Sequence, residues 1–394
     1  MNKLTKISLS TGSKISKPYI YTQFFPLPFD KYITFHSDNV GTAKNYDYIQ
    51  DVINILLPVL NKENIKIVQL GAATDRQFSN CVSLRGNTSV NQTAYIIQNS
   101  MLHFGVDGFS THIAASFDIP LVSLFSNNFV GCDKPYFGSP EKQVLITSYD
   151  RTESKKPSFA NDEMPKSINL IKPEEIAAAV FKLLKINFEI PFETVFTGKK
   201  YSNMMIQESY PNHRRSLFKD DLLVEIRADK GQFNEEDMFY QLAQYKKSIL
   251  VLDKPINLNV VRQFRPHVQM IAFKITEIDY RPFLSELEAL GCKLMLISDL
   301  PTETINSLKI KYYDIGMIQP FNNVLDDKIN ELKKDADNLY YRSCKITASK
   351  DKLFSSQAGE ESDLPMQNLD SYQKVIDLPV FWKELDFYTI IRKK

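Results

Sequence analysis

The chain has 394 residues, of which 43% are hydrophobic and 12% aromatic, and its 48 lysines and arginines against 47 acidic residues leave a formal net charge of +1. This composition is typical of a globular protein and excludes a disordered one, and the length accommodates two domains of ordinary size. The near-neutral balance argues against nucleic-acid binding through bulk charge, although it leaves room for a local basic groove.

Cysteine usage and the N-terminal sequence indicate the compartment. The four cysteines are far apart and form no CxxC pair, which predicts free thiols in a reducing compartment, without a zinc site or a disulfide framework. No apolar run approaches the roughly 20 residues of a membrane span, and the basic N-terminus lacks the apolar core of a secretory signal. We therefore expect a cytoplasmic protein without a transmembrane segment. The cysteines are Cys81, Cys132, Cys292 and Cys344.

The first domain is expected over residues 30–185. Residues 1–29, polar and then rich in proline and aromatic residues, predict an irregular lead-in. A β-type run over 32–36 follows, and after a polar loop the pattern predicts a helix over 46–60, because its apolar residues recur at helical spacing. These apolar residues are Ile49, Val52, Ile53 and Leu56.

The next elements alternate between strand and helix. Residues 65–70 read as a buried strand that ends at Gly71, and Ser89 with Gln92 matches a capping box that starts a helix over 90–101. Strands that alternate with helices at this spacing predict a parallel, doubly wound sheet.

The stretch from residue 102 to 125 carries the strongest functional pattern. An apolar approach over 102–106 breaks at Asp107-Gly108, restarts as a small helix that contains His112, and continues as a strand over 121–125. The first backbone N–H groups of such a helix have no intrahelical partner, and together with the helix dipole they form a seat for an anion such as a phosphate.

The remaining chain predicts a second α/β domain. A helix that begins at Pro173 closes the first domain near Lys185, and residues 186–218 are interpreted as a linker. Residues 219–320 contain five short strand patterns with helices between them, which predicts a second Rossmann-like sheet. Residues 321–394 are expected to form a C-terminal helix and a mixed tail, in which the polar segment 355–370 is interpreted as a mobile loop.

The stretch around Asp107 and His112 resembles a known family. Asp107, four intervening residues and His112, followed by Ile113-Ala114-Ala115, Ile119-Pro120 and the strand over 121–125, resemble the nucleotide-sugar-binding half of the heptosyltransferase-like family 9 glycosyltransferases. The resemblance covers about residues 30–190. It implies a GT-B architecture of two Rossmann-like domains, with the donor-type domain first in this chain although it comes second in the family. Gly108 follows Asp107 at once, whereas the family places its glycine one residue later, where this chain has Phe109.

The resemblance and the strand ends together give the candidate donor-binding residues. Lys44 matches a lysine that neutralises the donor pyrophosphate, and a solvated lysine is the alternative interpretation. Asp107 lies at a strand end, where ligands bind in open α/β sheets, although Asp-Gly is also a common turn. Ser110 and Thr111 can bind phosphate or cap the helix, and His112 can contact phosphate or brace the loop. The candidate donor-binding residues are Lys44, Gly71, Asp107, Gly108, Ser110, Thr111, His112 and Asn127.

An inverting transferase of this kind needs a general base for the acceptor hydroxyl, usually a carboxylate from the other domain. Asp229 is the first candidate, because it follows the first strand of the second domain and comes before a glycine, although a solvated loop acid is the simpler interpretation. No His/Cys ligand cluster is present, so we expect neither a metal nor another cofactor.

The sequence therefore predicts a metal-independent GT-B glycosyltransferase, of hexosyl or heptosyl type, that moves a sugar from a nucleotide-sugar donor to an acceptor hydroxyl. The acceptor is left open between a glycan, a lipid-linked glycan and a modified nucleic-acid base. The last would need a basic groove, for which Lys199-Lys200-Tyr201 with Arg214-Arg215 is the candidate patch. The same fold would also suit a nucleotide-sugar epimerase or a non-catalytic nucleotide-binding module.

Overall fold

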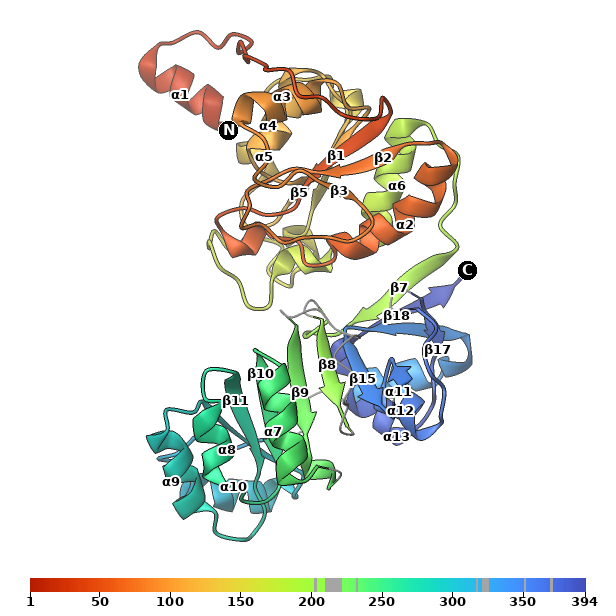
Figure 1. The fold of residues 1–394 in the computed structure, drawn as a ribbon. Helices are drawn as coiled ribbons and strands as arrows, with labels where there is room; N and C mark the ends of the chain where they lie inside the picture. The colour runs from red at the N-terminus through yellow and green to blue at the C-terminus, as the bar shows by residue number, and fades with distance from the viewer. Residues whose placement is uncertain are drawn as a thin grey trace. The chain divides into compact units, whose positions relative to one another are not determined.

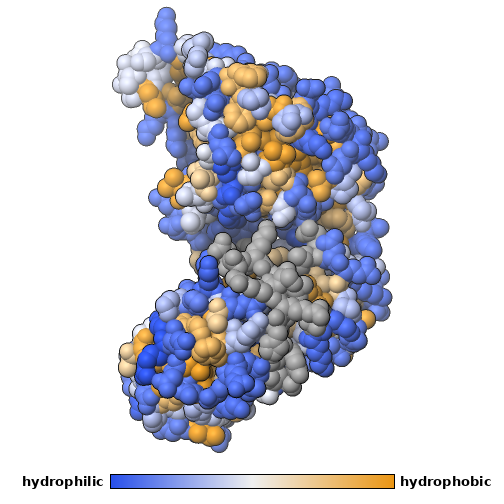
Figure 2. Space-filling view, viewed as in Figure 1, coloured by the Kyte–Doolittle hydropathy of each residue, from blue (hydrophilic) through white to orange (hydrophobic). Residues whose placement is uncertain are grey.

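The computed structural model describes residues 1–201, 204–209, 222–231, 233–316, 318–320, 326–350, 352–368 and 371–394. The chain divides into two compact units, Met1–Thr194 and Val195–Lys394, which Figure 1 colours from red to yellow-green and from green to blue. On the face shown in Figure 2, hydrophilic side chains dominate both units. Hydrophobic side chains gather on the first unit around α3, Val90–Gln98. None of the described helices is long and apolar enough to cross a membrane.

The first unit is built on a parallel sheet of six strands in the order β3-β2-β1-β4-β5-β6. This order is that of a doubly wound Rossmann sheet. Strands are added on one side from β1 to β3 and on the other side from β4 to β6, so the strand order reverses between β1 and β4. The mixed α/β class predicted from the sequence is therefore confirmed. The strands are β1 Tyr32–His36, β2 Lys66–Gln69, β3 Val82–Ser83, β4 His103–Val106, β5 Leu121–Phe125 and β6 Gln143–Thr147.

Helices pack on the sheet of the first unit in two pairs. α2 (Ile49–Lys62) packs on α6 (Pro173–Leu184), and α3 (Val90–Gln98) packs on α4 (Phe109–Ser116). The predicted capping box at the start of α3 is confirmed, because Ser89 and Gln92 exchange side-chain and backbone hydrogen bonds. Small residues of α4, Ala114 and Ala115, are buried in the same core cluster as α3 and the sheet, so α4 lies close to the strands that it connects.

A helix that the sequence did not predict precedes this sheet. Residues 1–29 were expected to be irregular, but α1 spans Lys3–Thr11. Its ends are set locally: the Asn2 side chain accepts a hydrogen bond from the Leu4 backbone N–H, and Gly12 ends the helix in the left-handed region at φ 68°. No described residue of α1 is buried, and the few apolar residues of this short segment, Leu4, Ile7 and Leu9, did not form a pattern long enough to predict a helix.

The second unit contains an eight-stranded sheet in the order β13-β12-β11-β10-β9-β8-β15-β16. Its neighbouring strands pair in parallel except β15 with β16. Strands β8 to β13 are neighbours in chain order, so the reversal that characterises the first sheet is found here between β8 and β15 instead. The strands are β8 Met205–Glu208, β9 Leu223–Arg227, β10 Ser248–Leu252, β11 Val268–Lys274, β12 Leu294–Ser298, β13 Ile318–Pro320, β15 Lys345–Ser349 and β16 Lys352–Phe354.

Helices alternate along the chain with the strands from β9 to β13, and further helices lie in the C-terminal part of the unit. They are α7 Glu235–Gln244, α8 Leu258–Gln263, α9 Arg281–Ala289, α10 Thr302–Lys311, α11 Asp326–Lys333, α12 Gln357–Glu361 and α13 Pro379–Lys383. A four-stranded sheet in the order β17-β14-β18-β7 completes the unit around an aromatic core that includes Tyr341, Phe381 and Tyr388. Its strands are β7 Phe192–Thr197, β14 Leu339–Ser343, β17 Gln373–Lys374 and β18 Tyr388–Lys393.

Two stretches differ from the expected elements. The stretch 186–218, interpreted as a linker, contains β7 and β8, and the boundary between the units falls at Thr194. The tail segment 355–370, interpreted as a loop, contains α12, whose first turn is capped by Ser356. β7 and β8 pair with strands that come from far along the chain, and such long-range pairing leaves no local pattern in the sequence.

Candidate functional site

The topological switch point of the first sheet lies between β1 and β4. Their chains leave the sheet in opposite directions, so a crevice opens beyond His36 and Val106, the last residues of the two strands. Close approach of the two strands depends on Gly105, whose φ is +158° and whose added Cβ would lie 2.2 Å from the His36 carbonyl oxygen. A side chain at this position would push the edges of the crevice apart.

A lysine and an aspartate meet at this crevice. Lys44 ends a short 3₁₀ turn, Thr42–Lys44, after β1, and its Nζ lies 2.5 Å from Oδ2 of Asp107, which directly follows β4. The Lys44 side chain is 22% exposed and that of Asp107 only 8%. Asn39 donates from its side-chain amide to the Asp107 carbonyl oxygen at 2.8 Å. Two loops that the sequence separates by more than sixty residues are thus joined by charge.

The beginning of α4 lies next to this pair. Gly108 is its N-cap residue, and the first backbone N–H groups of the helix have no intrahelical acceptor. Ser110 and Thr111 are fully buried: the Ser110 hydroxyl lies 3.3 Å from Nδ1 of His36, and the Thr111 hydroxyl donates to the Val106 carbonyl at 3.1 Å. Their side chains therefore brace the helix against the strands, and it is the backbone that can offer donors to an anion.

A pocket of about 760 Å³ opens on these groups. Four of the residues predicted from the sequence line it, namely Lys44, Asp107, Gly108 and His112. Desolvation lowers the pKa of His112, against the opposing pull of Asp107 and Asp133, so its imidazole is favoured in the neutral form. The remaining lining residues come from the N-terminal segment, from Asn39, from Phe109 and Ser116 of α4, and from α5 (Val130–Asp133) and the loop after it.

Two further predicted residues shape loops in the first unit. Gly71 has φ +141°, and a Cβ there would lie 2.1 Å from Oδ2 of Asp75, an oxygen that accepts from the Ala72 backbone N–H at 2.8 Å. Asn127 donates from its side chain to the Ala160 carbonyl at 2.7 Å. Neither is among the described residues that line the pocket. Their part in donor binding stays a prediction.

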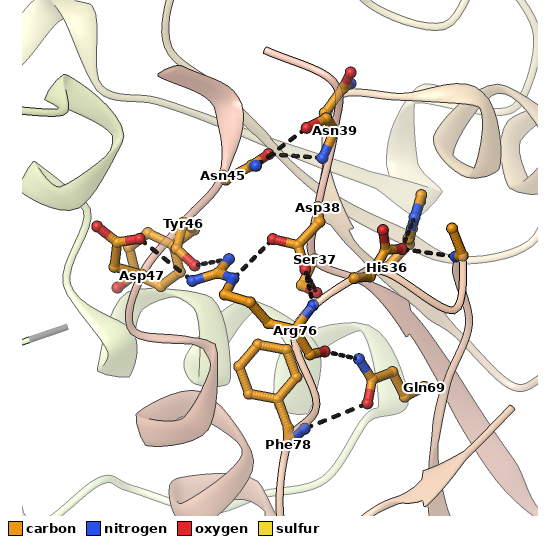
Figure 3. A network of polar contacts seen from close by, with 12 residues as sticks. His36, Ser37, Asp38, Asn39, Asn45, Tyr46, Asp47, Gln69, Arg76 and Phe78 are labelled. Atoms are coloured by element: carbon orange, nitrogen blue, oxygen red, sulfur yellow. Dashed lines mark hydrogen bonds and ion pairs between the residues drawn. The ribbon is translucent and has the colours of Figure 1, made fainter. Parts of the chain in front are cut away.

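An arginine holds the loops behind the crevice (Figure 3). Arg76 follows β2, and its guanidinium bonds Asp38 at 2.8 Å and the Tyr46 carbonyl at 2.9 Å, while Nη1 lies 3.3 Å from Asp47. Its backbone N–H also donates to Asp38. Asp47 additionally pairs with Lys166 at 2.6 Å. This network fixes the loops after β1 and β2 to the start of α2, and so fixes the chain on which Lys44 lies.

Asp229, the candidate base, lies in the second unit. Both of its carboxylate oxygens accept hydrogen bonds of 2.7 Å from Arg227. The assignment of Asp229 as the base stays a prediction. In the candidate basic patch, the Tyr201 hydroxyl accepts from Arg342 at 2.7 Å. The other half of that patch, Arg214-Arg215, lies outside the described residues.

Comparison with known proteins bears on the first unit. Residues 46–162 match the model of glycosyltransferase family 9 (heptosyltransferase). The resemblance read from the sequence is thus confirmed for this part of the chain, which contains Asp107, His112 and the strand after them. The matched range ends before the second unit begins.

Solved structures of family 9 enzymes are similar at low identity. The glycosyltransferase of family 9 from Veillonella parvula DSM 2008 is 17% identical over 40% of this chain and 47% of its own, with a TM-score of 0.32. The ADP-heptose LPS heptosyltransferase II of E. coli is 18% identical over 46% of this chain and 50% of its own, with a TM-score of 0.32. The chain thus spans about half the length of these structures. No curated protein matches the sequence significantly.

Sequence reasoning missed several residues of the pocket. Asn39 could have been found, because it lies in the polar loop that directly follows the first strand. Phe109, at the position where the family has its glycine, lines the pocket and packs edge-on against His36 with ring centroids 5.3 Å apart. Lys3 and Asp133, which pair at 2.5 Å, come from elements that the local pattern did not connect. Among the described residues, no group of three or more His, Cys, Asp or Glu side chains is placed to hold a metal.

Proposed function

We propose that the first unit binds a nucleotide-sugar and that the protein transfers the sugar to an acceptor hydroxyl. The observation that carries this proposal is the Lys44–Asp107 pair, which lies beside the N-terminus of α4 at the switch point of a Rossmann sheet. Both residues line a pocket of about 760 Å³. The match of residues 46–162 to glycosyltransferase family 9 supports the same activity.

Each group has a definite part in this proposal. The pyrophosphate of the donor would accept hydrogen bonds from the first N–H groups of α4 and would be neutralised by the Lys44 ammonium. Asp107 holds Lys44 in place at 2.5 Å, and Asn39 fixes the Asp107 backbone. As charge develops on the leaving nucleoside diphosphate, these positive groups would stabilise it, which lowers the barrier to cleavage of the sugar–phosphate bond.

One observation favours a second candidate. Arg227 donates hydrogen bonds to both oxygens of Asp229, so this carboxylate has a structural partner within its own unit. A protein without a working base would bind the donor but not consume it. A non-catalytic nucleotide-binding module is therefore the function that the experiment must separate from a transferase.

The test follows the fate of the donor. The full chain is incubated with UDP-, GDP-, CDP- and ADP-sugars, with ADP-heptose included because the family description names heptosyltransferases, in the presence and absence of a bacterial glycan and glycolipid extract. Release of free nucleoside diphosphate that depends on the extract is the expected result for a transferase. Conversion of the sugar without extract would indicate an epimerase instead. Binding without consumption would favour the non-catalytic module.

Matched variants connect the activity to the site. Lys44→Ala removes the pocket cation and is expected to lower nucleotide release at least tenfold. Lys142→Ala removes the lysine of another ion pair in the same unit, 2.7 Å from Asp118, outside the described lining of the pocket, and should leave release unchanged. Equal loss in both variants would contradict the assignment of the site.

A further inference from the structure

The N-terminal helix α1 is one wall of the pocket. The lining includes the N-cap residue Asn2 together with Lys3, Leu4, Ile7 and Ser8 of α1, and the residues just after the helix continue the same wall. Figure 1 shows α1 beside α4 and α5. The family match begins at residue 46, so the match does not include this segment.

Polar contacts hold α1 in this position. Lys3 Nζ lies 2.5 Å from Oδ1 of Asp133, and the Asn2 side chain donates to the Lys134 carbonyl at 2.9 Å. The hydrogen bond and charge of Asp133 raise the pKa of Lys3, against a smaller desolvation effect. Both contacts fall at the N-terminal end of the helix, which therefore joins α5 at that end.

The apolar side chains of α1 do not enter a core. Leu4 is 39% exposed and Ile7 54% exposed, although both line the pocket. A helix of nine residues is only marginally stable without tertiary packing. A ligand that covers its apolar side chains would therefore stabilise it. Across the pocket lining, Phe109, Tyr136 and Phe137 add aromatic surface, and the last two pack edge-on with ring centroids 5.3 Å apart.

We infer that α1 forms the wall of the nucleobase subsite, with Leu4 and Ile7 as its contact residues. This inference rests on the proposed function, because that function places the pyrophosphate at Lys44 and α4. The rest of the pocket then binds the nucleobase, which is the flat and apolar part of the donor. A nucleobase offers two such faces to Leu4, Ile7 and the aromatic residues, while serines of the segment 8–16 offer hydroxyls to its polar edge.

Two ligands separate the subsites, namely a nucleoside diphosphate and inorganic pyrophosphate. In Ile7→Asn, affinity for the nucleoside diphosphate that binds the wild type best should fall about tenfold, while affinity for pyrophosphate stays unchanged. In Lys44→Ala both affinities should fall. Leu9→Asn is the matched control, because Leu9 lies on the same helix, is 69% exposed and is outside the described lining; it should bind both ligands as the wild type does.

Each other outcome overturns the inference. If Ile7→Asn binds the nucleoside diphosphate like the wild type while Lys44→Ala has lost it, the proposed function stands and α1 is not the nucleobase wall. If Ile7→Asn instead raises only the KM for acceptor, the wall contacts the acceptor. If the folded wild type binds neither ligand, the proposed function fails and the inference falls with it. Circular dichroism of all variants excludes loss of folding as the cause.

The Lys3–Asp133 ion pair, which joins α1 to α5, allows an independent test. Lys3→Ala removes the contact to Asp133 and should speed both association and dissociation of the nucleoside diphosphate in stopped-flow measurements, because α1 then moves away more often. Lys6→Ala, on the same helix but outside the described pocket lining, should leave both rates unchanged. Identical rates in wild type, Lys3→Ala and Lys6→Ala would contradict a wall that α1 forms.

Discussion

At the scale of single residues, the site depends on a carboxylate that is shielded from water. The Asp107 side chain is only 8% exposed, and Lys44 is the cation beside it at 2.5 Å. Lys44→Ala leaves this charge without its partner, and we expect a loss of about 1–3 kcal/mol in the free energy of unfolding, because an unpaired buried charge is costly. Urea denaturation measures the loss.

The surface pair of the same unit provides the comparison. Lys142 and Asp118 have side chains that are 44% and 37% exposed, and Lys142→Ala should cost about 0–1 kcal/mol. The double variant Lys44→Ala/Asp107→Asn should recover part of the stability that Lys44→Ala loses. Equal costs in the two single variants would contradict the description of Asp107 as a shielded charge.

A buried histidine gives the first unit a pH dependence. His103 lies within β4, and burial lowers its pKa to about 3, with a smaller contribution from His36. In the unfolded chain this histidine is protonated below about pH 6.5, whereas in the folded chain it stays neutral. Its contribution to the free energy of unfolding is therefore fully present above about pH 6.5. The free energy of unfolding falls by up to about 1.4 kcal/mol per pH unit as the pH drops towards about 3. Thermal unfolding between pH 7.5 and 5 measures this, and His103→Gln should show a flatter profile. Parallel profiles in both proteins would refute the assignment.

Sequence reasoning at this scale found the residues whose chemistry is set by their place at a strand end. Asp107 and Gly108 follow this rule, Lys44 and His112 came from the family resemblance, and all four line one pocket. It could not tell that Ser110 and Thr111 point inward, because burial of a hydroxyl depends on the neighbouring strand. It also could not pair Asp229 with Arg227, since the alternation of residues along a strand does not show which acid of the following loop contacts the strand.

At the scale of elements, the crevice depends on close contact between β1 and β4. Gly105→Ala places a Cβ 2.2 Å from the His36 carbonyl, and we expect a loss of more than about 2 kcal/mol in the free energy of unfolding together with weaker nucleotide binding. Gly131→Ala in α5, where an added Cβ meets nothing within 4 Å among the described atoms, should cost no stability. Denaturation and nucleotide titration of both variants test this, and a harmless Gly105→Ala would contradict the packing described for the switch point.

Elements with strong local signals were predictable. The helices α2, α3 and α6 are indicated by apolar spacing, by the Ser89–Gln92 capping box and by Pro173. α1 was missed because its caps, Asn2 and Gly12, come without a buried face. β7 was missed because its partner β18 lies near the other end of the chain.

At the scale of the molecule, the chain has two units, each with cores of its own. Every described residue that lines the pocket lies in the first unit. A fragment of residues 1–194 that is folded by circular dichroism should therefore bind the donor nucleotide within about tenfold of the affinity of the full chain. A folded fragment that has lost binding would show that residues of the second unit hold the nucleotide.

The class of each unit was accessible from the sequence, because strands and helices alternate with short connections. The strand order of the second sheet was not accessible, since β8 and β15 pair across more than a hundred residues. The order of donor and acceptor halves in the chain stays a prediction, because the family match reaches only residues 46–162.

We propose above all that Lys44 and Asp107 mark a nucleotide-sugar site. Calorimetric titration of UDP, ADP, GDP, CDP and their sugars into the full chain, beside Lys44→Ala and the matched Lys142→Ala, tests it most directly. We expect one nucleotide to bind selectively to the wild type and to Lys142→Ala, and to bind Lys44→Ala at least tenfold more weakly, a difference of about 1.4 kcal/mol or more. Failure of every nucleotide to bind the folded wild type, or equal binding by Lys44→Ala, would contradict it.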